Sequence, residues 1–294
     1  MDRTVGVIGL GIMGSAMSAS LLERGWTVIG HDLDEARRAE FAAAGGRVAA
    51  SGAEVAAGSP IIITSLPSPA AAKAVAREIA RSGAPQRIVI ETSTLTLDDK
   101  EAFRAALVEG EQIALDCPLS GTGAQARLRD LVVYASGDSA AIAAARPVFD
   151  DFARQTEDLG AYGNGSKMKF IANLLVAIHN VAAAEAMALG VRAGLDPHRL
   201  VEVAGAGAGG SRMFQMRAPM MADGVYEPAT MRISTWRKDM AIIGAFARAL
   251  GSATPLFDAT DPIYEAAYAN GQGDQDTACV HTILERMGDL TRTG

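Results

Sequence analysis

Cysteine and histidine are scarce in this sequence, which limits the kinds of site that it can build. Its 294 residues include two cysteines, Cys117 and Cys279, and four histidines. Two widely separated cysteines are too few for a disulfide framework or a cysteine-rich zinc cluster. We therefore expect buried thiols, a reducing compartment and no metal site. The histidines, which show no metal-ligand spacing, are His31, His179, His198 and His281.

The chain also lacks blocks of like charge and long uninterrupted apolar runs. Its formal net charge is −7, which argues against an electrostatic surface for nucleic acid. The most apolar long segment, residues 171–194, contains Glu185 and Arg192 and is too polar for a bilayer span, so we expect a buried helix. A strand predicted from Val5 leaves no room for a signal peptide before it. We expect a cytoplasmic protein with a small-molecule ligand.

Glycines are plentiful, and three of them follow the first predicted strand closely. Residues 5–14 read VGVIGLGIMG, in which Gly9, Gly11 and Gly14 form G-x-G-x-x-G before a helical pattern. The first glycine permits a sharp turn, the second lets the backbone approach a pyrophosphate, and the third lets the helix pack on the strand. A glycine turn with no ligand is the alternative. The strand, turn and helix together favour a dinucleotide-binding loop.

An acidic residue supports that interpretation and bears on the choice of cofactor. Asp32 follows the next predicted strand, residues 27–31, where a ribose-binding carboxylate is expected. Its carboxylate can bind the ribose 2′-hydroxyl and would repel a 2′-phosphate. Arg37 and Arg38 are compatible with NADP as the cofactor. The sequence therefore favours NAD, with NADP as the alternative.

The pattern of the chain changes about halfway along. Residues 1–162 alternate β-branched runs with alanine-rich helical runs, which is typical of an α/β fold with a doubly wound parallel sheet. Residues 163–294 show helical stretches only, and a long helix beginning near Ser166 joins the halves. We expect a Rossmann-type domain followed by an all-α domain. The later strands predicted for the sheet are residues 60–65, 87–91 and 112–116, and two more, 131–135 and 155–159, could complete it.

Polar or turn residues follow two of these strands. Leu66-Pro67-Ser68 comes after an isoleucine run, and Thr92-Ser93-Thr94 comes after the next strand. Ligands of open α/β sheets bind outside the carboxyl ends of the strands, so both segments should face the cofactor. Each could also be a simple turn.

Two lysines lie near the predicted domain junction, in GNGSKMKFIAN at residues 163–173. Lys169 and Asn173 are four residues apart and share a helix face, whereas Lys167 points elsewhere. The start of a helix and partial burial both lower the pKa of an ammonium group, which suits a lysine that exchanges protons. A solvent-exposed Lys169 is the alternative.

Taken together, these motifs resemble the β-hydroxyacid dehydrogenase family, which includes 3-hydroxyisobutyrate dehydrogenases and tartronate semialdehyde reductases. The resemblance runs from Val5 to at least Asp239. It implies an NAD(P)-dependent enzyme that interconverts a small 3-hydroxy acid and its semialdehyde or keto acid, in a cleft between the two domains. The segments that carry it are GLGIMGSAMSASLLERG, LP, STL, DCPLSG, GNGSKMKFIAN and WRKDM.

The resemblance also implies a role for individual residues. Lys169 would be the general acid/base, and Asn173 would orient the substrate. Ser120, Gly121 and Thr122 would bind the substrate carboxylate. Lys238 and Asp239 would close the site near the nicotinamide, where Lys238 would contact both substrate and cofactor. The remaining residues implied to contact the cofactor are Gly9, Leu10, Gly11, Ile12, Met13, Gly14, Asp32, Leu66, Pro67 and Thr94.

The loop after Ser120 departs from the family pattern. It reads SGTGAQARLRDL, so that Thr122, Gln125, Arg129 and Asp130 replace small or hydroxyl residues. Ala172 stands where an asparagine often precedes the second one. These differences leave room for a substrate with an additional polar or charged group.

Two other functions fit the same fold. A dinucleotide-binding interaction protein without activity would keep the glycine loop, but the intact Lys169 argues against it. Related imine reductases commonly lack this lysine, which also counts against imine reduction. The alanine- and methionine-rich residues 182–189 offer more apolar surface than one small domain buries, so we expect a homodimer or homotetramer.

Overall fold

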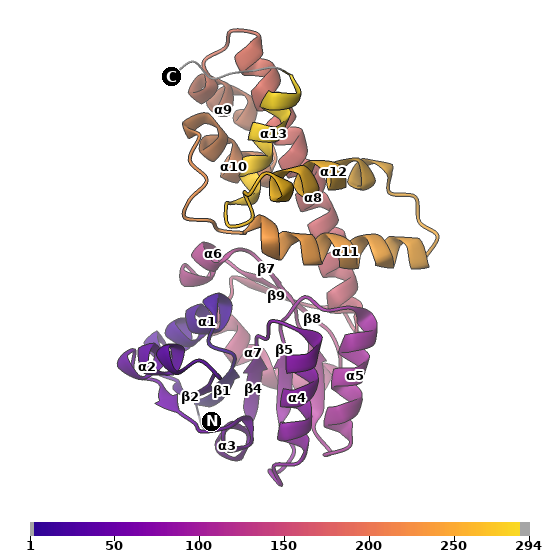
Figure 1. Cartoon of the computed structure of the whole chain (residues 1–294). Helices are drawn as coiled ribbons and strands as arrows, with labels where there is room; N and C mark the ends of the chain where they lie inside the picture. The colour runs from indigo at the N-terminus through magenta and orange to yellow at the C-terminus, as the bar shows by residue number, and fades with distance from the viewer. Residues whose placement is uncertain (1–2, 289–294) are drawn as a thin grey trace. The chain divides into compact units, whose positions relative to one another are not determined.

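The computed structural model describes residues 3–288. The chain forms two compact units, Met1–Lys169 and Phe170–Gly294. The first runs from indigo to magenta in Figure 1, and the second continues through orange to yellow. The boundary between the units falls inside the long helix α8 (Asn164–Arg192). The predicted domain boundary, between residues 162 and 163, lies just before this helix.

The first unit is built on a six-stranded sheet in which all neighbouring strands pair in parallel. Strand β1 lies between β2 and β4, so the order of the chain reverses beside it. Such a reversal opens a crevice at the carboxyl ends of the strands, where ligands bind. The predicted Rossmann-type sheet is confirmed. Its order is β3 (Arg47–Val48), β2 (Thr27–His31), β1 (Thr4–Ile8), β4 (Ile61–Thr64), β5 (Ile88–Glu91) and β6 (Ile113–Asp116).

The last two strands expected in this sheet belong to a separate one. Strand β8 (Val132–Ala135) pairs antiparallel with β7 (Leu119–Ser120) and parallel with β9 (Gln155–Asp158). A single antiparallel bridge, between Asp116 and Ser136, joins this small sheet to the end of β6. The prediction that residues 131–135 and 155–159 complete the main sheet was therefore wrong. Strand β6 ends at Asp116, and Pro118, two residues later, has no N–H group to extend a ladder.

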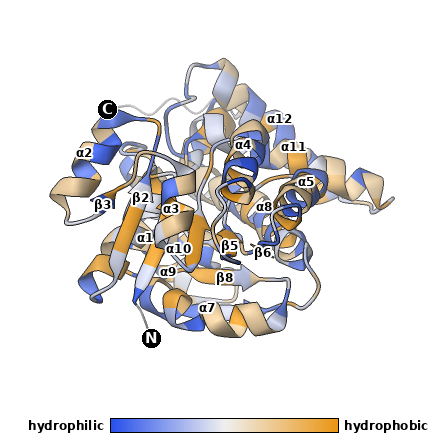
Figure 2. Cartoon of the chain, turned by 90° about the horizontal axis from the view of Figure 1, so that it is seen from below, coloured by the Kyte–Doolittle hydropathy of each residue, from blue (hydrophilic) through white to orange (hydrophobic). Residues whose placement is uncertain are grey.

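Helices cover both faces of the large sheet, and this explains its run of β-branched residues. Alternate strand residues enter opposite cores, as Ile62 and Ile63 do, and both are fully buried. The strands are mostly orange, and thus hydrophobic, in Figure 2. Helices α1 (Ile12–Glu23), α2 (Glu35–Ala43) and α7 (Ser139–Phe152) contribute to one core, and α3 (Gly52–Gly58), α4 (Pro69–Ala80) and α5 (Leu97–Val108) to the other.

Several helices of this unit begin where a side chain satisfies free backbone N–H groups. Ser68 accepts a hydrogen bond from the Ala71 N–H at the start of α4, and Pro69 follows it. Thr96 caps α5 through the Asp99 N–H. These caps end the loops after β4 and β5 and hold them at the carboxyl edge of the sheet.

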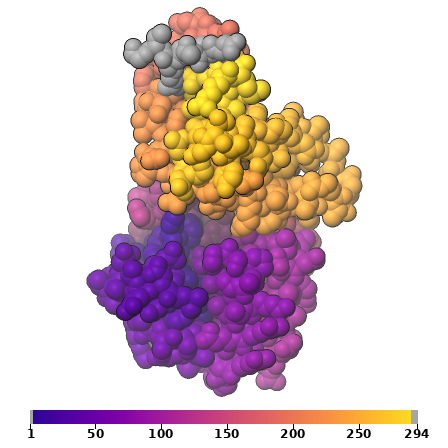
Figure 3. Space-filling view, in the orientation of Figure 1, coloured from indigo at the N-terminus to yellow at the C-terminus, as the bar shows by residue number. Residues whose placement is uncertain are grey.

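The described part of the second unit is helical, as expected, apart from one isolated bridge between Arg232 and Asp276. Its core contains aromatic pairs, with ring centroids 6.1 Å apart for Trp236 and Tyr264. Asp276 caps a short 3₁₀ turn, Thr277–Cys279, just before the last described helix. Figure 3 shows the surface of these elements in orange and yellow. The helices after α8 are α9 (Pro197–Ala206), α10 (Arg212–Asp223), α11 (Ile233–Ala249), α12 (Pro255–Ala269) and α13 (Val280–Met287).

Helix α8 is both long and apolar. Among the described residues it is the one helix whose length and composition would allow it to cross a membrane, a test that the core helix of a soluble protein also passes. Ala177, Ala184 and Met187 on this helix are fully buried. One face of α8 is therefore buried as expected, whereas Ile171, Leu175 and Leu189 are exposed on another.

Candidate active site

The three glycines of the loop differ in the space around them, and only Gly11 has room for a Cβ atom. Gly9 has a φ of +93°, and a Cβ atom there would lie 2.2 Å from the carbonyl oxygen of Ser65. A Cβ atom at Gly14 would lie 1.9 Å from the carbonyl oxygen of Gly9. At Gly11 the nearest atom would be the Arg37 side chain, 3.7 Å away. Gly9 and Gly14 therefore serve the close packing of the loop, and the backbone at Gly11 can be approached.

The start of helix α1 is suited to an anion. Gly11 is its N-cap residue and has no side chain to accept a hydrogen bond from the first turn. The exposed N–H groups and the positive end of the helix dipole favour a phosphate at such a position. Ile12, the first residue of α1, is 72% exposed. This loop and helix start fit the pyrophosphate of a dinucleotide.

Asp32 lies beside the same loop. Its carboxylate accepts hydrogen bonds from the N–H groups of Leu10, at 2.7 Å, and Asp34, at 2.9 Å. Burial raises the pKa of Asp32, but those two hydrogen bonds and the Arg37 guanidinium lower it by more, so its pKa is below the ordinary value. Arg37 approaches the carboxylate at 3.5 Å, whereas Arg38 donates to the backbone carbonyl of Asp32. An ionised acceptor is thus fixed at the end of β2.

A groove in this unit begins at the glycine loop, where Leu10, Gly11 and Ile12 line it. It has a volume of about 640 Å³ and follows α1 and α2 past Gly11, Glu40 and Arg127. Neither Asp32 nor Leu66 lines it. The groove therefore meets the expected cofactor site at the glycine loop but does not include Asp32.

The loops after β4 and β5 are joined by hydrogen bonds, as expected for segments at one edge of the sheet. The Leu66 N–H donates to the Ser93 hydroxyl oxygen at 2.8 Å. The Thr92 hydroxyl donates to the carbonyl oxygen of Thr64 at 2.7 Å. Leu66, Pro67 and Thr94 belong to these two loops, and their contact with the cofactor stays a prediction.

The loop after β6 is held by its own side chains. Thr122 and Gln125 form a capping box at the start of α6 (Gly123–Arg127): the Thr122 N–H donates to Gln125 Oε1 at 3.0 Å, and the Thr122 hydroxyl accepts from the Gln125 N–H. The Gln125 amide also donates to Asp130, which pairs with Arg154. The residues that depart from the family pattern therefore stabilise this loop. A substrate contact by Ser120, Gly121 or Thr122 stays a prediction.

Helix α8 places the two lysines of its first turns differently. Lys167 is exposed and contacts Asn164 through its ammonium group. Lys169 is only 9% exposed, and Asn173, one turn further, is 5% exposed. This burial agrees with the expectation that Lys169 is not a solvent-exposed lysine.

Asn173 belongs to a polar cluster with α11. Its side-chain amide donates to the Asp239 carboxylate at 3.1 Å. The other oxygen of Asp239 lies 3.3 Å from the Lys238 ammonium nitrogen, and the Lys238 side chain is 41% exposed. The structure thus brings together Asn173, Lys238 and Asp239, which were predicted from separate motifs.

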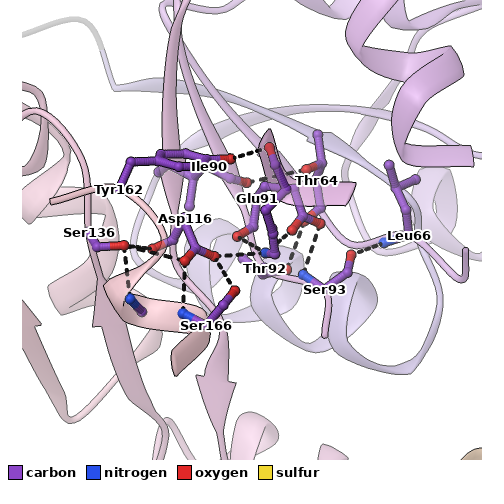
Figure 4. Close-up of polar contacts among 12 residues, drawn as sticks. Thr64, Leu66, Ile90, Glu91, Thr92, Ser93, Asp116, Ser136, Tyr162 and Ser166 are labelled. Carbon is purple, nitrogen blue, oxygen red and sulfur yellow. Dashed lines mark hydrogen bonds and ion pairs between the residues drawn. The ribbon is translucent and has the colours of Figure 1, made fainter. Parts of the chain in front are cut away.

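Sequence reasoning missed a buried ionic cluster formed by Glu91, Lys100 and Asp116. All three side chains are fully buried. Burial lowers the pKa of Lys100, but Asp116 and Glu91 raise it by more, so the lysine stays protonated. Figure 4 shows the two carboxylates at the ends of β5 and β6. The sequence did offer one signal of this cluster, because two neighbouring buried strands each end in a carboxylate residue.

The two cysteines and His31 have contacts that indicate a structural role. Cys117 and Cys279 are free and buried, and burial raises the pKa of both thiols, that of Cys279 to about 12. His31 contacts the carbonyl oxygen of Ala49 through its ring nitrogen. Within residues 3–288 no group of three or more histidine, cysteine, aspartate or glutamate side chains could hold a metal ion.

Comparisons with known proteins cover nearly all of the described chain. A sequence model of the NAD binding domain of 6-phosphogluconate dehydrogenase matches residues 4–162. A second model, the NAD-binding domain of NADP-dependent 3-hydroxyisobutyrate dehydrogenase, matches residues 163–284. The chain is 36% identical to an L-threonate dehydrogenase of Cupriavidus necator, over 97% of both proteins.

Solved structures give the same picture of the fold. A Mycobacterium tuberculosis 3-hydroxyisobutyrate dehydrogenase with L-serine is 27% identical, with a TM-score of 0.87 over 97% of this chain and 99% of that one. An imine reductase from a Pseudomonas species has a TM-score of 0.65 at 20% identity, over 95% of this chain and 98% of that one. At that identity the second likeness concerns the fold alone.

Proposed function

The chain belongs to the β-hydroxyacid dehydrogenase family, and on that premise we propose that Lys169 is the general acid/base in the oxidation of a small polar 3-hydroxy acid. The protein is an NAD(P)-dependent hydroxyacid dehydrogenase. The observation that carries the proposal is a lysine 9% exposed and one turn from Asn173 on α8. When bound, NAD(P) would supply the acceptor for the hydride of the hydroxyl-bearing carbon.

The residues of this chain would manage the proton and the geometry. Neutral Lys169 accepts the hydroxyl proton as the hydride leaves, and its ammonium form returns the proton in the reverse reaction. Asn173, positioned by Asp239, orients the substrate oxygen. The Gly11 backbone and the start of α1 would hold the pyrophosphate, and Asp32 would hold the adenosine ribose. The ionised state of Asp32 supports NAD over NADP.

L-Threonate is the first substrate to test. It carries hydroxyl groups at both C2 and C3, and the relative from Cupriavidus necator is named for it. The other proposed classes have less support: imine reduction rests on a likeness of fold, and an inactive binding protein has no need of a buried Lys169.

We expect NADH formation from L-threonate or a related hydroxy acid, with a higher kcat/KM for NAD than for NADP. The measurement is absorbance at the reduced nicotinamide band with a panel of 2- and 3-hydroxy acids, each tested with both cofactors. Product analysis identifies the oxidised carbon. Measurable NADH binding without turnover of any compound would instead support the inactive binding protein.

The oligomeric state follows from an apolar stripe on α8. Ile171, Leu175, Ala182 and Leu189 are exposed and recur at helical spacing, with Leu189 71% exposed. A second copy of the chain would bury such a surface, so we infer a homodimer or homotetramer.

In light scattering at micromolar concentration we expect the mass of a dimer or a tetramer. The double variant Ile171→Glu/Leu189→Glu should lower the mass, because two buried carboxylates would oppose association. Leu256→Glu, on α12 and 68% exposed, is the control that should leave it unchanged. A monomeric wild type would refute the stripe as an interface.

A further inference from the structure

The buried cluster of Glu91, Lys100 and Asp116 is more than a core ion pair. The Lys100 ammonium nitrogen lies 2.9 Å from Asp116 Oδ1 and also contacts Glu91 Oε2. Two carboxylates and one ammonium leave a formal charge of −1 without solvent. Burying ions costs several kcal/mol each, and apolar side chains of similar volume often stabilise a core as well or better. Stability alone therefore gives little reason for this cluster.

On one side, the cluster holds the start of α8. Asp116 accepts hydrogen bonds from the Ser166 N–H and the Ser166 hydroxyl, both at 2.8 Å. The Gly165 N–H donates to Ser136 Oγ at 2.9 Å, and the Ser136 hydroxyl donates to Asp116. The positive end of the α8 dipole also compensates the excess negative charge. Lys169 lies three residues beyond Ser166, about 5 Å along the helix axis.

On the other side, the cluster holds the loops predicted to line the cofactor. Glu91 Oε1 accepts a hydrogen bond from the Ser93 N–H at 2.9 Å. The Ser93 hydroxyl oxygen accepts from the Leu66 N–H at 2.8 Å. A continuous set of polar contacts therefore runs from the loop after β4 to the first turn of α8, and Lys100 is its central cation. Figure 4 shows most of its members.

We propose that Lys100 is a positioning residue, which pairs with Glu91 and Asp116 and so fixes the first turn of α8 relative to the loops after β4 and β5. The proposal rests on the proposed role of Lys169, whose distance to the reacting carbon this contact set would hold constant. Lys100 suits the task because it stays protonated, as the raised pKa indicates. Tyr162, just before α8, adds a further tie by donating its hydroxyl to the Lys100 carbonyl oxygen at 2.9 Å.

The test compares Lys100→Met with Lys100→Met/Glu91→Gln. The single variant leaves two unpaired buried carboxylates. The double variant removes one charge of each sign and leaves an amide oxygen at position 91 that can still accept from the Ser93 N–H. The matched control is Glu101→Gln, next to Lys100 on α5 but exposed and paired only with Arg104 in the described contacts. Thermal melting and circular dichroism establish which variants are folded.

The first readout is kinetic. We expect the folded Lys100 variant to lose about 10- to 100-fold in kcat, because a catalytic group displaced by about 1 Å can cost that much. KM and NAD affinity should change by less than kcat, because the glycine loop and Asp32 would still hold the cofactor. The control should keep the wild-type kcat.

The second readout is independent of activity. Hydrogen–deuterium exchange of peptides covering residues 160–172 should be faster in the Lys100 variants than in the wild type and the control. Without Lys100, Asp116 and Ser136 would hold the Ser166 and Gly165 amides less firmly. A folded double variant with wild-type kcat and exchange would overturn the proposal. Loss of folding in both variants would assign the cluster to stability alone and would also overturn it.

The variant Lys169→Ala distinguishes failure of the proposed function from failure of the positioning role. If Lys169→Ala keeps its activity, the role of Lys169 is wrong whatever Lys100 does. If Lys169→Ala is inactive but the folded Lys100 variants are fully active, only the positioning role is wrong.

Discussion

We expect Lys169→Ala to lose about 10²- to 10⁴-fold in kcat, which is the contribution typical of general acid/base catalysis. The methyl group of alanine can neither take the hydroxyl proton in oxidation nor return it in reduction. Affinity for NAD should change little, since the cofactor is assigned to the glycine loop and Asp32 at other positions of the chain. Steady-state kinetics with the substrate identified by the panel, and NADH binding followed by fluorescence, measure the two effects separately.

Lys167→Ala is the matched control for this variant. Lys167 lies two residues away on the same helix, but it is exposed and its ammonium contacts only Asn164 in the described contacts. It should keep the wild-type kcat. Equal losses in both variants would indicate general damage to α8, and unchanged turnover in Lys169→Ala would rule out the proposed acid/base.

The second large effect concerns the glycine loop, where two alanine substitutions should behave in opposite ways. In Gly14→Ala the new Cβ atom would lie 1.9 Å from the carbonyl oxygen of Gly9. The backbone must move, so we expect a lower Tm without cofactor and a destabilisation of about 1–3 kcal/mol. In Gly11→Ala the nearest atom would be 3.7 Å away, so the Tm should change little.

Cofactor affinity separates the same two variants. The new methyl group at Gly11 would occupy the space where the backbone approaches the pyrophosphate. We therefore expect the Kd of Gly11→Ala for NAD to rise at least about tenfold, a free-energy change of about 1.4 kcal/mol. Titration calorimetry at a temperature where both variants are folded measures this. A Gly11→Ala variant with wild-type affinity would mean that the pyrophosphate does not lie at this loop.

Patterns that depend on neighbouring residues could be interpreted from the sequence. The strand, glycine turn and helix of residues 5–23, and the shared helix face of Lys169 and Asn173, follow from local spacing. The change from alternating strands to helices near Ser166 was visible for the same reason. The family resemblance added the link from Asn173 to Lys238 and Asp239, which are distant in the sequence.

Contacts between segments that are distant in the sequence were harder to predict. Residues 131–135 and 155–159 have the composition of strands, but composition does not specify a partner, and they pair with each other instead of extending the main sheet. Gln125 suggested a polar substrate group, whereas the structure shows it in a capping box with Thr122. The capping sequence T-x-x-Q was present, and the short helix after it was not expected.

The sequence by itself determined the sheet with its glycine loop, the helical second half and the lysine to test. Each rests on a periodicity or a spacing within about 20 residues, which backbone geometry converts directly into a local structure. Only the tertiary structure decided that Glu91, Lys100 and Asp116 meet in the core and hold the start of α8. Their pairing depends on which strands become neighbours and on the absence of water between them, and neither property is encoded in any one segment.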